Sequence, residues 1–184
     1  ALALLWLAGR AALLFSAAIG PTLAAAIDTA FLVTLAAVAA REIVAGKNWR
    51  NLRVLIVLAV LIAGNIVFHA EVLLHGAADY GIRIAIGAVI VLISLIGGRI
   101  VPSFTRNWLV RMNPGRLPQP FSRFDAVTLA AGALALLCWI ALPSGPVTGA
   151  ALTAAGVLHA VRLARWAGDR TTADRLVLVL HTAY

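Results

Sequence analysis

The hydrophobic residues of this chain of 184 residues occur in long continuous runs that are separated by short polar segments. Each long run has about 17 to 21 residues, the length that an α-helix needs to cross the ~30 Å hydrocarbon core of a bilayer. A last, shorter run at 176–184 cannot span a membrane and is predicted to begin a seventh helix. The six long runs are 1–19, 22–40, 54–74, 81–101, 126–142 and 147–163.

The composition supports this interpretation, because 62% of the residues are hydrophobic and only 12% are charged. Soluble domains are about half apolar and about a quarter charged. Alternating ten-residue strands typical of membrane barrels are absent. We therefore predict an all-α, polytopic transmembrane helix bundle in a lipid bilayer, with six spanning helices and the start of a seventh. We expect residues 1–184 to form one transmembrane domain, cut from a longer protein whose remaining helices are its partners.

The basic residues fix the expected orientation. All but two of the 15 Lys and Arg residues lie in the connections after the second, fourth and sixth runs or in the last residues of those runs. The positive-inside rule places these loops in the cytoplasm, so the protein is predicted to be a multi-pass membrane protein. The net charge of +8 is spread over short loops rather than gathered on one face. No nucleic-acid partner is therefore expected.

Several polar residues interrupt the runs, where a charge costs at least about 2.5–3.5 kcal/mol unless it has a partner or a function. Counting residues from the turn at Gly20 places Arg10 and Asp28 at similar depth in the outer half of the membrane. Asn65 and His69, which are four residues apart on one helix face, complete a predicted outer cluster. The predicted inner cluster contains Arg99, Arg106, His159, Arg162, His181 and Tyr184.

The residue types limit the chemistry. One cysteine and four histidines exclude a thiolate cage, whereas imidazole suits haem iron, copper and zinc. Two histidines could ligate a b-type haem while arginines pair with its propionates. An isolated histidine can also serve only as a hydrogen-bond partner for a neighbouring helix. In the same way, Arg10 with Asp28 can be a purely structural ion pair. No nucleophile or acid–base constellation is visible, so the sequence alone does not assign an enzymatic activity.

The segment GGRIVPSFTRN, residues 97–107, concentrates unusually restrictive residues at the end of one run. Gly97 and Gly98 allow close approach of a helix or a flat ligand. Pro102 cannot donate a helical hydrogen bond, so we expect the helix to end at residue 101, with Arg99 and Arg106 on either side of the break.

This segment resembles the signature of the NnrS family, bacterial inner-membrane proteins that contain haem and copper and are associated with nitric oxide metabolism. The resemblance implies haem b and copper as cofactors, nitric oxide as a possible ligand, and a role in nitrosative-stress protection. Members of the family have about twice as many helices, with a histidine-rich element upstream and polar elements downstream of this region. Further matches in order are WLAGR at 6–10, Asp28 with Phe31, Asn65 with His69, His159, Arg162, Arg165 and Trp166, and His181 with Tyr184.

His69 is the candidate metal ligand that the sequence favours most, because it lies well inside the membrane beside Asn65. A secondary transporter with an intramembrane polar site is the alternative function, and an assembly subunit ranks third. The full set of candidate metal ligands is His69, His159 and His181, and the candidate cofactor-binding residues are Arg10, Asp28, Asn65, Arg99, Arg106, Arg162 and Tyr184.

The topology can be tested with alkaline phosphatase fusions in the full-length protein. Fusions at Lys47 and Arg116 should be inactive, because both positions lie in loops rich in basic residues, and a fusion at Ser144 should be active. An active fusion at Lys47 would overturn the orientation and every depth derived from it.

Overall fold

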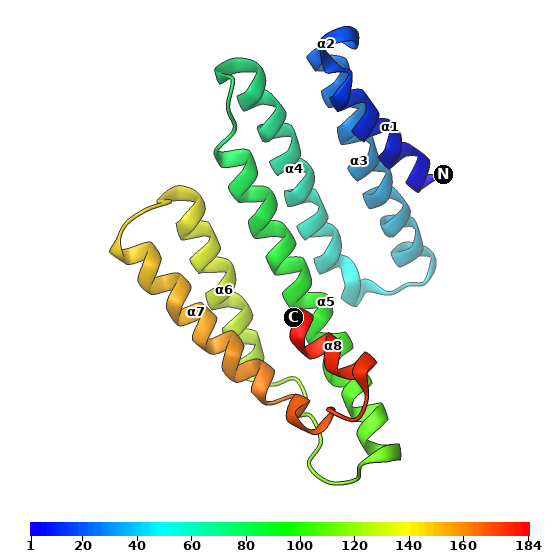
Figure 1. Cartoon of the computed structure of the whole chain (residues 1–184), viewed down its shortest axis with the longest axis vertical. Coiled ribbons are helices and arrows are strands. Elements are labelled where there is room, and N and C mark those ends of the chain that lie inside the picture. Colours follow the sequence, from blue (N-terminus) through cyan, green and yellow to red (C-terminus); the bar gives the residue numbers. More distant parts are fainter. The chain divides into compact units, whose positions relative to one another are not determined.

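The computed structural model describes residues 1–184, and all of its regular elements are helices (Figure 1). Five of these helices are long and apolar enough to cross a membrane. The predicted all-α membrane architecture is therefore confirmed, whereas the expected number of six spans is not. The chain divides into two compact units, Ala1–Val89 and Ile90–Tyr184, and the two are described separately below.

The first unit begins with α1 (Leu2–Leu14) and the single turn α2 (Ser16–Ile19), which are separated at Phe15. A helix of 13 residues is about 20 Å long, too short to span the hydrocarbon core alone. This interruption is why the first hydrophobic run does not count among the spans. Gly20, at φ 90°, then turns the chain into α3 (Pro21–Ala45), which packs along α1 (Figure 1).

The remainder of this unit consists of α4 (Leu52–His75) and the first part of α5 (Tyr80–Met112), and α4 also packs against α3. Small residues allow α4 and α5 to approach closely. A Cβ on Gly64 would lie 2.9 Å from the backbone nitrogen of Ala85, and one on Gly81 would overlap the backbone of Phe68. Glu71 fixes the start of α5 by accepting hydrogen bonds from the backbone N–H groups of residues 79, 80 and 81, at 2.8–3.1 Å.

The second unit contains the rest of α5 together with α6 (Arg123–Ala141), α7 (Pro146–Ala164) and the short helix α8 (Arg175–Ala183). A capping box starts α6, in which Ser122 and Asp125 exchange side-chain and backbone hydrogen bonds. The turn at Gly145 brings α7 back along α6 (Figure 1). Asp174 caps α8 by accepting from the N–H groups of residues 176 and 177.

The prediction that a helix ends at residue 101 is wrong, because α5 continues through Pro102 to Met112. A proline removes one helical hydrogen bond, and in a membrane helix neighbouring side chains can compensate for the disturbed turn. In the turn that follows, Thr105 Oγ1 donates to the carbonyl oxygen of Val101 at 2.8 Å.

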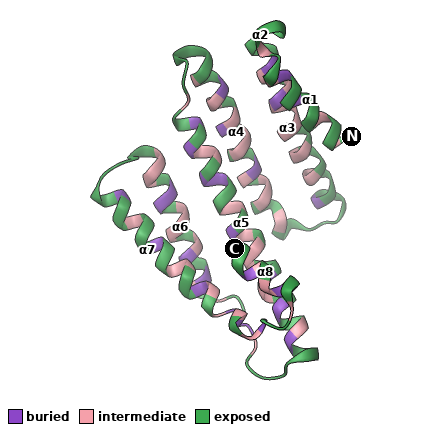
Figure 2. Ribbon diagram, viewed as in Figure 1, coloured by how far each residue is buried: buried purple, intermediate pink, exposed green.

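The outer surfaces of the helices are largely apolar and exposed, and the buried residues form narrow strips along the helix contacts (Figure 2). Large aliphatic side chains such as Leu14 (81% exposed) and Leu134 (66% exposed) point away from the protein. In water such a surface would cause aggregation, whereas its exposure to hydrocarbon carries no free-energy cost. The exposed surface is therefore the one that a lipid bilayer would cover.

Candidate functional site

The first unit contains a cluster of four polar side chains, here called the Asp28 cluster, in which Arg10, Asn65 and His69 surround Asp28. Arg10 from α1 forms an ion pair with Asp28 Oδ1. Two residues of α4 reach the other carboxylate oxygen: Asn65 Nδ2 donates to Oδ2 at 3.0 Å, and His69 Nε2 lies 3.1 Å from it. Asp28 is only 5% exposed. The outer cluster predicted from depth and spacing is thus present as direct contacts.

Local features of the helices position these four groups. Gly9 lets α1 approach α3, because a Cβ there would lie 3.2 Å from the Cα of Asp28. Asn65 and His69 share a face of α4, being one turn apart. Thr29 donates to Asn65 Oδ1 at 2.7 Å, which turns the Asn65 amide nitrogen toward Asp28. Both carboxylate oxygens of Asp28 and the Asn65 amide oxygen are therefore matched with donors.

This arrangement determines which nitrogen of His69 carries a proton. An ionised carboxylate only accepts hydrogen bonds, so Nε2 must donate to Asp28. In a neutral ring, Nδ1 then holds the free lone pair. His69 lies in the wall of a groove of about 470 Å³ on α3 and α4, whose other lining residues are mostly alanines and aliphatic side chains.

The second unit contains another cluster, centred on Arg162 and here called the Arg162 cluster. Arg162 is only 1% exposed. Its Nε donates to Asp125 Oδ1 at 3.2 Å, and its Nη1 donates to the carbonyl oxygen of Ser94 at 3.2 Å and to Tyr184 Oη at 2.8 Å. A Cβ on Gly98 would collide with the guanidinium, so this glycine provides the space for it.

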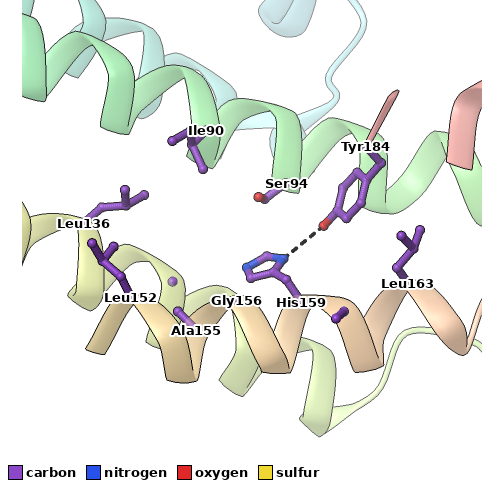
Figure 3. Close-up of a pocket in the computed structure, with 11 residues that line it drawn as sticks. Ile90, Ser94, Leu136, Leu152, Ala155, Gly156, His159, Leu163 and Tyr184 are labelled. Carbon is purple, nitrogen blue, oxygen red and sulfur yellow. Dashed lines mark hydrogen bonds between the residues drawn. The ribbon is translucent and has the colours of Figure 1, made fainter. Parts of the chain in front are cut away.

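His159 connects this cluster to a cavity of about 380 Å³ in the second unit. Its Nδ1 lies 3.3 Å from Tyr184 Oη, and Figure 3 shows the ring beside Ser94 with its other nitrogen directed toward the cavity. A Cβ on Gly132 would lie 2.9 Å from His159 Nε2. Aliphatic side chains from α5, α6 and α7 make up most of the wall.

The other predicted residues of the inner cluster lie elsewhere in the second unit. His181 Nε2 is 2.8 Å from Thr105 Oγ1, and a Cβ on Gly168 would be 2.5 Å from His181 Nδ1, so the ring is tightly packed. Arg99 and Arg106 are exposed residues of α5. No group of three or more His, Cys, Asp or Glu side chains in residues 1–184 is placed to hold a metal ion.

Sequence reasoning missed Asp125, which is 3% exposed and pairs with both Arg162 and Arg165, the latter at 3.4 Å. The predicted run began one residue later, so Asp125 was assigned to a loop. The spacing Ser-x-x-Asp from Ser122 was the available signal, because it is typical of a helix N-terminus. Ser94 had no such signal, since it contributes its backbone carbonyl to Arg162, a group that every residue possesses.

Comparison with known proteins gives one match. The model of one protein family, described as NnrS protein, matches residues 1–184. No curated protein and no solved structure matched the chain.

The contacts of the Asp28 cluster predict that Arg10 and Asp28 are energetically coupled. Asp28 is 5% exposed, so removing Arg10 leaves a buried carboxylate without its counter-charge, which is destabilising although the Arg10 side chain itself is 49% exposed. Arg10→Ala and Asp28→Ala should each lower the yield and the thermal stability of the full-length protein in detergent, with the double variant no worse than either. Strictly additive losses would show that the pair does not interact.

The Arg162 cluster predicts a large difference between two aspartates of the second unit. Asp125→Ala leaves Arg162 buried without its carboxylate, so the free energy of unfolding should fall by about 3–5 kcal/mol. Asp169 also pairs with an arginine, Arg116, at 2.5 Å, but both side chains are more than half exposed. Asp169→Ala, the matched control, should cost about 0–1 kcal/mol. Thermal unfolding of both variants measures the difference, and equal losses would contradict the assignment.

Proposed function

The chain belongs to the NnrS family, and from this premise we propose that it binds haem, copper or both in the bacterial inner membrane, in the response to nitric oxide. We infer that His69 is a metal ligand that this chain contributes. The observation that carries the proposal is the contact between His69 Nε2 and the buried carboxylate of Asp28. Metal-binding histidines almost always donate their second ring N–H to a carboxylate, a carbonyl or water.

The residues around His69 fit such a cofactor. Asp28 holds the proton on Nε2, which leaves Nδ1 as the nitrogen able to ligate a metal. The alanine-rich wall of the groove, which includes Ala26 and Ala30, leaves room for a flat group beside the imidazole. Haem iron or copper, when bound, would supply an open metal position able to take nitric oxide.

Besides pairing with Asp28, Arg10 could also bind a negatively charged group of the cofactor. Its side chain is 49% exposed, and one of its two terminal nitrogens pairs with the carboxylate. A guanidinium has five N–H groups, so the remaining ones can donate to a haem propionate. Asn65 would act indirectly, because its amide holds Asp28 in place while Thr29 holds the amide.

The cofactor roles of the residues in the predicted inner cluster remain predictions. His159 and His181 are proposed as ligands of a further metal or haem, with Arg99, Arg106, Arg162 and Tyr184 as possible partners of its charged groups. The contacts of the second unit favour His159 over His181, because the His159 ring faces a cavity whereas the His181 ring is packed against Gly168.

The proposal can be tested by metal and haem analysis of the purified full-length protein. His69→Ala should lose bound haem or copper while remaining in the membrane, because the ligating imidazole is gone. His75→Ala is the matched control and should retain both, since His75 lies exposed at the end of α4.

The absorption spectrum distinguishes the alternatives. A Soret band that responds to dithionite and nitric oxide in the wild type, and is lost in His69→Ala, supports the proposal. An unchanged spectrum and metal content in His69→Ala would show that the ligands lie elsewhere. A colourless, metal-free protein that moves a solute across liposomes would favour the transporter.

A further inference from the structure

The cavity of the second unit is separate from the Asp28 cluster and has a distinct chemical character (Figure 3). Most of its wall is aliphatic, with Ile90, Leu136, Leu152 and Leu163 contributing side chains. Its polar groups are gathered at one end, where Ser94, His159 and Tyr184 lie together. A molecule that fits this cavity must therefore be mainly apolar, with a polar group at one end.

The hydrogen bonds at the polar end determine what it offers to a ligand. Arg162 donates to Tyr184 Oη, so the tyrosine oxygen acts as an acceptor there and its own proton is free to be donated elsewhere. His159 Nδ1, at 3.3 Å, is one acceptor near this hydroxyl, and the Ser94 side chain is another hydrogen-bonding partner. If Nδ1 accepts, a neutral His159 carries its proton on Nε2, the nitrogen directed toward the cavity. The cavity then presents an N–H donor.

The charge balance indicates that the ligand is neutral. Arg162 is the buried cation of this unit, and it already pairs with Asp125. Its Nη1 is occupied by Ser94 and Tyr184, and its guanidinium is not part of the cavity wall. An anion in the cavity would have no counter-charge to meet it, and burying an unpaired charge is costly.

We propose that this cavity binds a neutral, lipid-soluble carbonyl compound of the quinone class, with His159 Nε2 donating a hydrogen bond to a carbonyl oxygen. Gly132, from α6, makes room for the imidazole itself, and Gly156, from α7, leaves open space in the cavity wall, which suits a flat ring. The aliphatic wall suits an alkyl tail. Ile90 and Leu152 are 43% and 36% exposed on candidate spanning helices, so the ligand can enter from the hydrocarbon.

The same histidine cannot use Nε2 both as a proton donor and as a metal ligand. Metal ligation through Nε2 would require Nδ1 to be the protonated nitrogen. The quinone proposal and a metal at His159 are therefore exclusive, whereas a metal at His69 is compatible with either. The experiment below separates these possibilities.

Glycine substitutions on α7 provide a sharp test. A Cβ on Gly156 or on Gly149 would meet no atom within 4 Å, so both positions accept a larger side chain, but only Gly156 lines the cavity. The full-length protein, in nanodiscs of quinone-free lipid, would be titrated with a photoreactive azido-ubiquinone that carries a decyl tail. Labelled peptides would be mapped by mass spectrometry. Gly156→Leu should raise the concentration for half-maximal labelling of residues 132–163 at least tenfold, and Gly149→Leu should leave it unchanged.

A second variant tests the donor. His159→Phe keeps an aromatic ring but loses the N–H group, and should weaken labelling about tenfold, the effect of one hydrogen bond. Excess decylubiquinone should compete with the probe, whereas decylbenzene and decanoate should not. Absence of labelling in the wild type, equal labelling in Gly156→Leu, or competition by decylbenzene as strong as by the quinone would each overturn the proposal.

The outcome is independent of the proposed metal site at His69. His69→Ala should not change quinone labelling, and Gly156→Leu should not change the haem or copper content. Loss of metal in His159→Phe together with unchanged quinone labelling would assign His159 to a metal and refute its role as a donor to the quinone.

Discussion

A charged side chain at membrane depth must find its counter-charge within the protein, because hydrocarbon neither solvates nor screens it. Each unit of this chain satisfies this constraint with one buried carboxylate: Asp28 faces Arg10, and Asp125 faces Arg162. Amide, hydroxyl and imidazole groups occupy the remaining positions around each pair. The polar clusters therefore follow from the burial of charge, and candidate binding groups lie where that burial requires them.

The constraint on charge is matched by a constraint on size. Helices in lipid gain little from burying apolar surface against one another, so they associate through close backbone packing and a few polar contacts. Gly64 beside Ala85, Gly81 beside Phe68 and Gly98 beside Arg162 are helix positions where an added Cβ would lie less than 3.0 Å from a backbone or polar atom. Charge and size together fix the register of neighbouring helices, since a shift of one residue would both separate an ion pair and place a side chain where only hydrogen fits.

Much of the fold, the Asp28 cluster and the grouping of His159, Arg162 and Tyr184 could be predicted from the sequence, for definable reasons. Run lengths predict spanning helices because bilayer thickness sets them, and depth with four-residue spacing predicted that Asp28, Asn65 and His69 meet. The break between helices at Phe15 and the continuation of α5 through Pro102 could not be predicted. Both depend on how the adjacent helical turns accommodate the interruption. Asp125 was missed because it lies at a helix boundary, where hydrophobicity is least informative.

Gly98 shows how a sequence can encode an electrostatic requirement without a charged residue. The space that its missing side chain leaves is filled by the Arg162 guanidinium. An alanine at this position would change no charge and break no turn, yet it would push a cation away from Asp125, Ser94 and Tyr184. In a mutational survey, position 98 would therefore behave like a salt-bridge residue, and its tolerance would follow side-chain volume rather than polarity. A neutral glycine would then be as selective as the arginine that it accommodates.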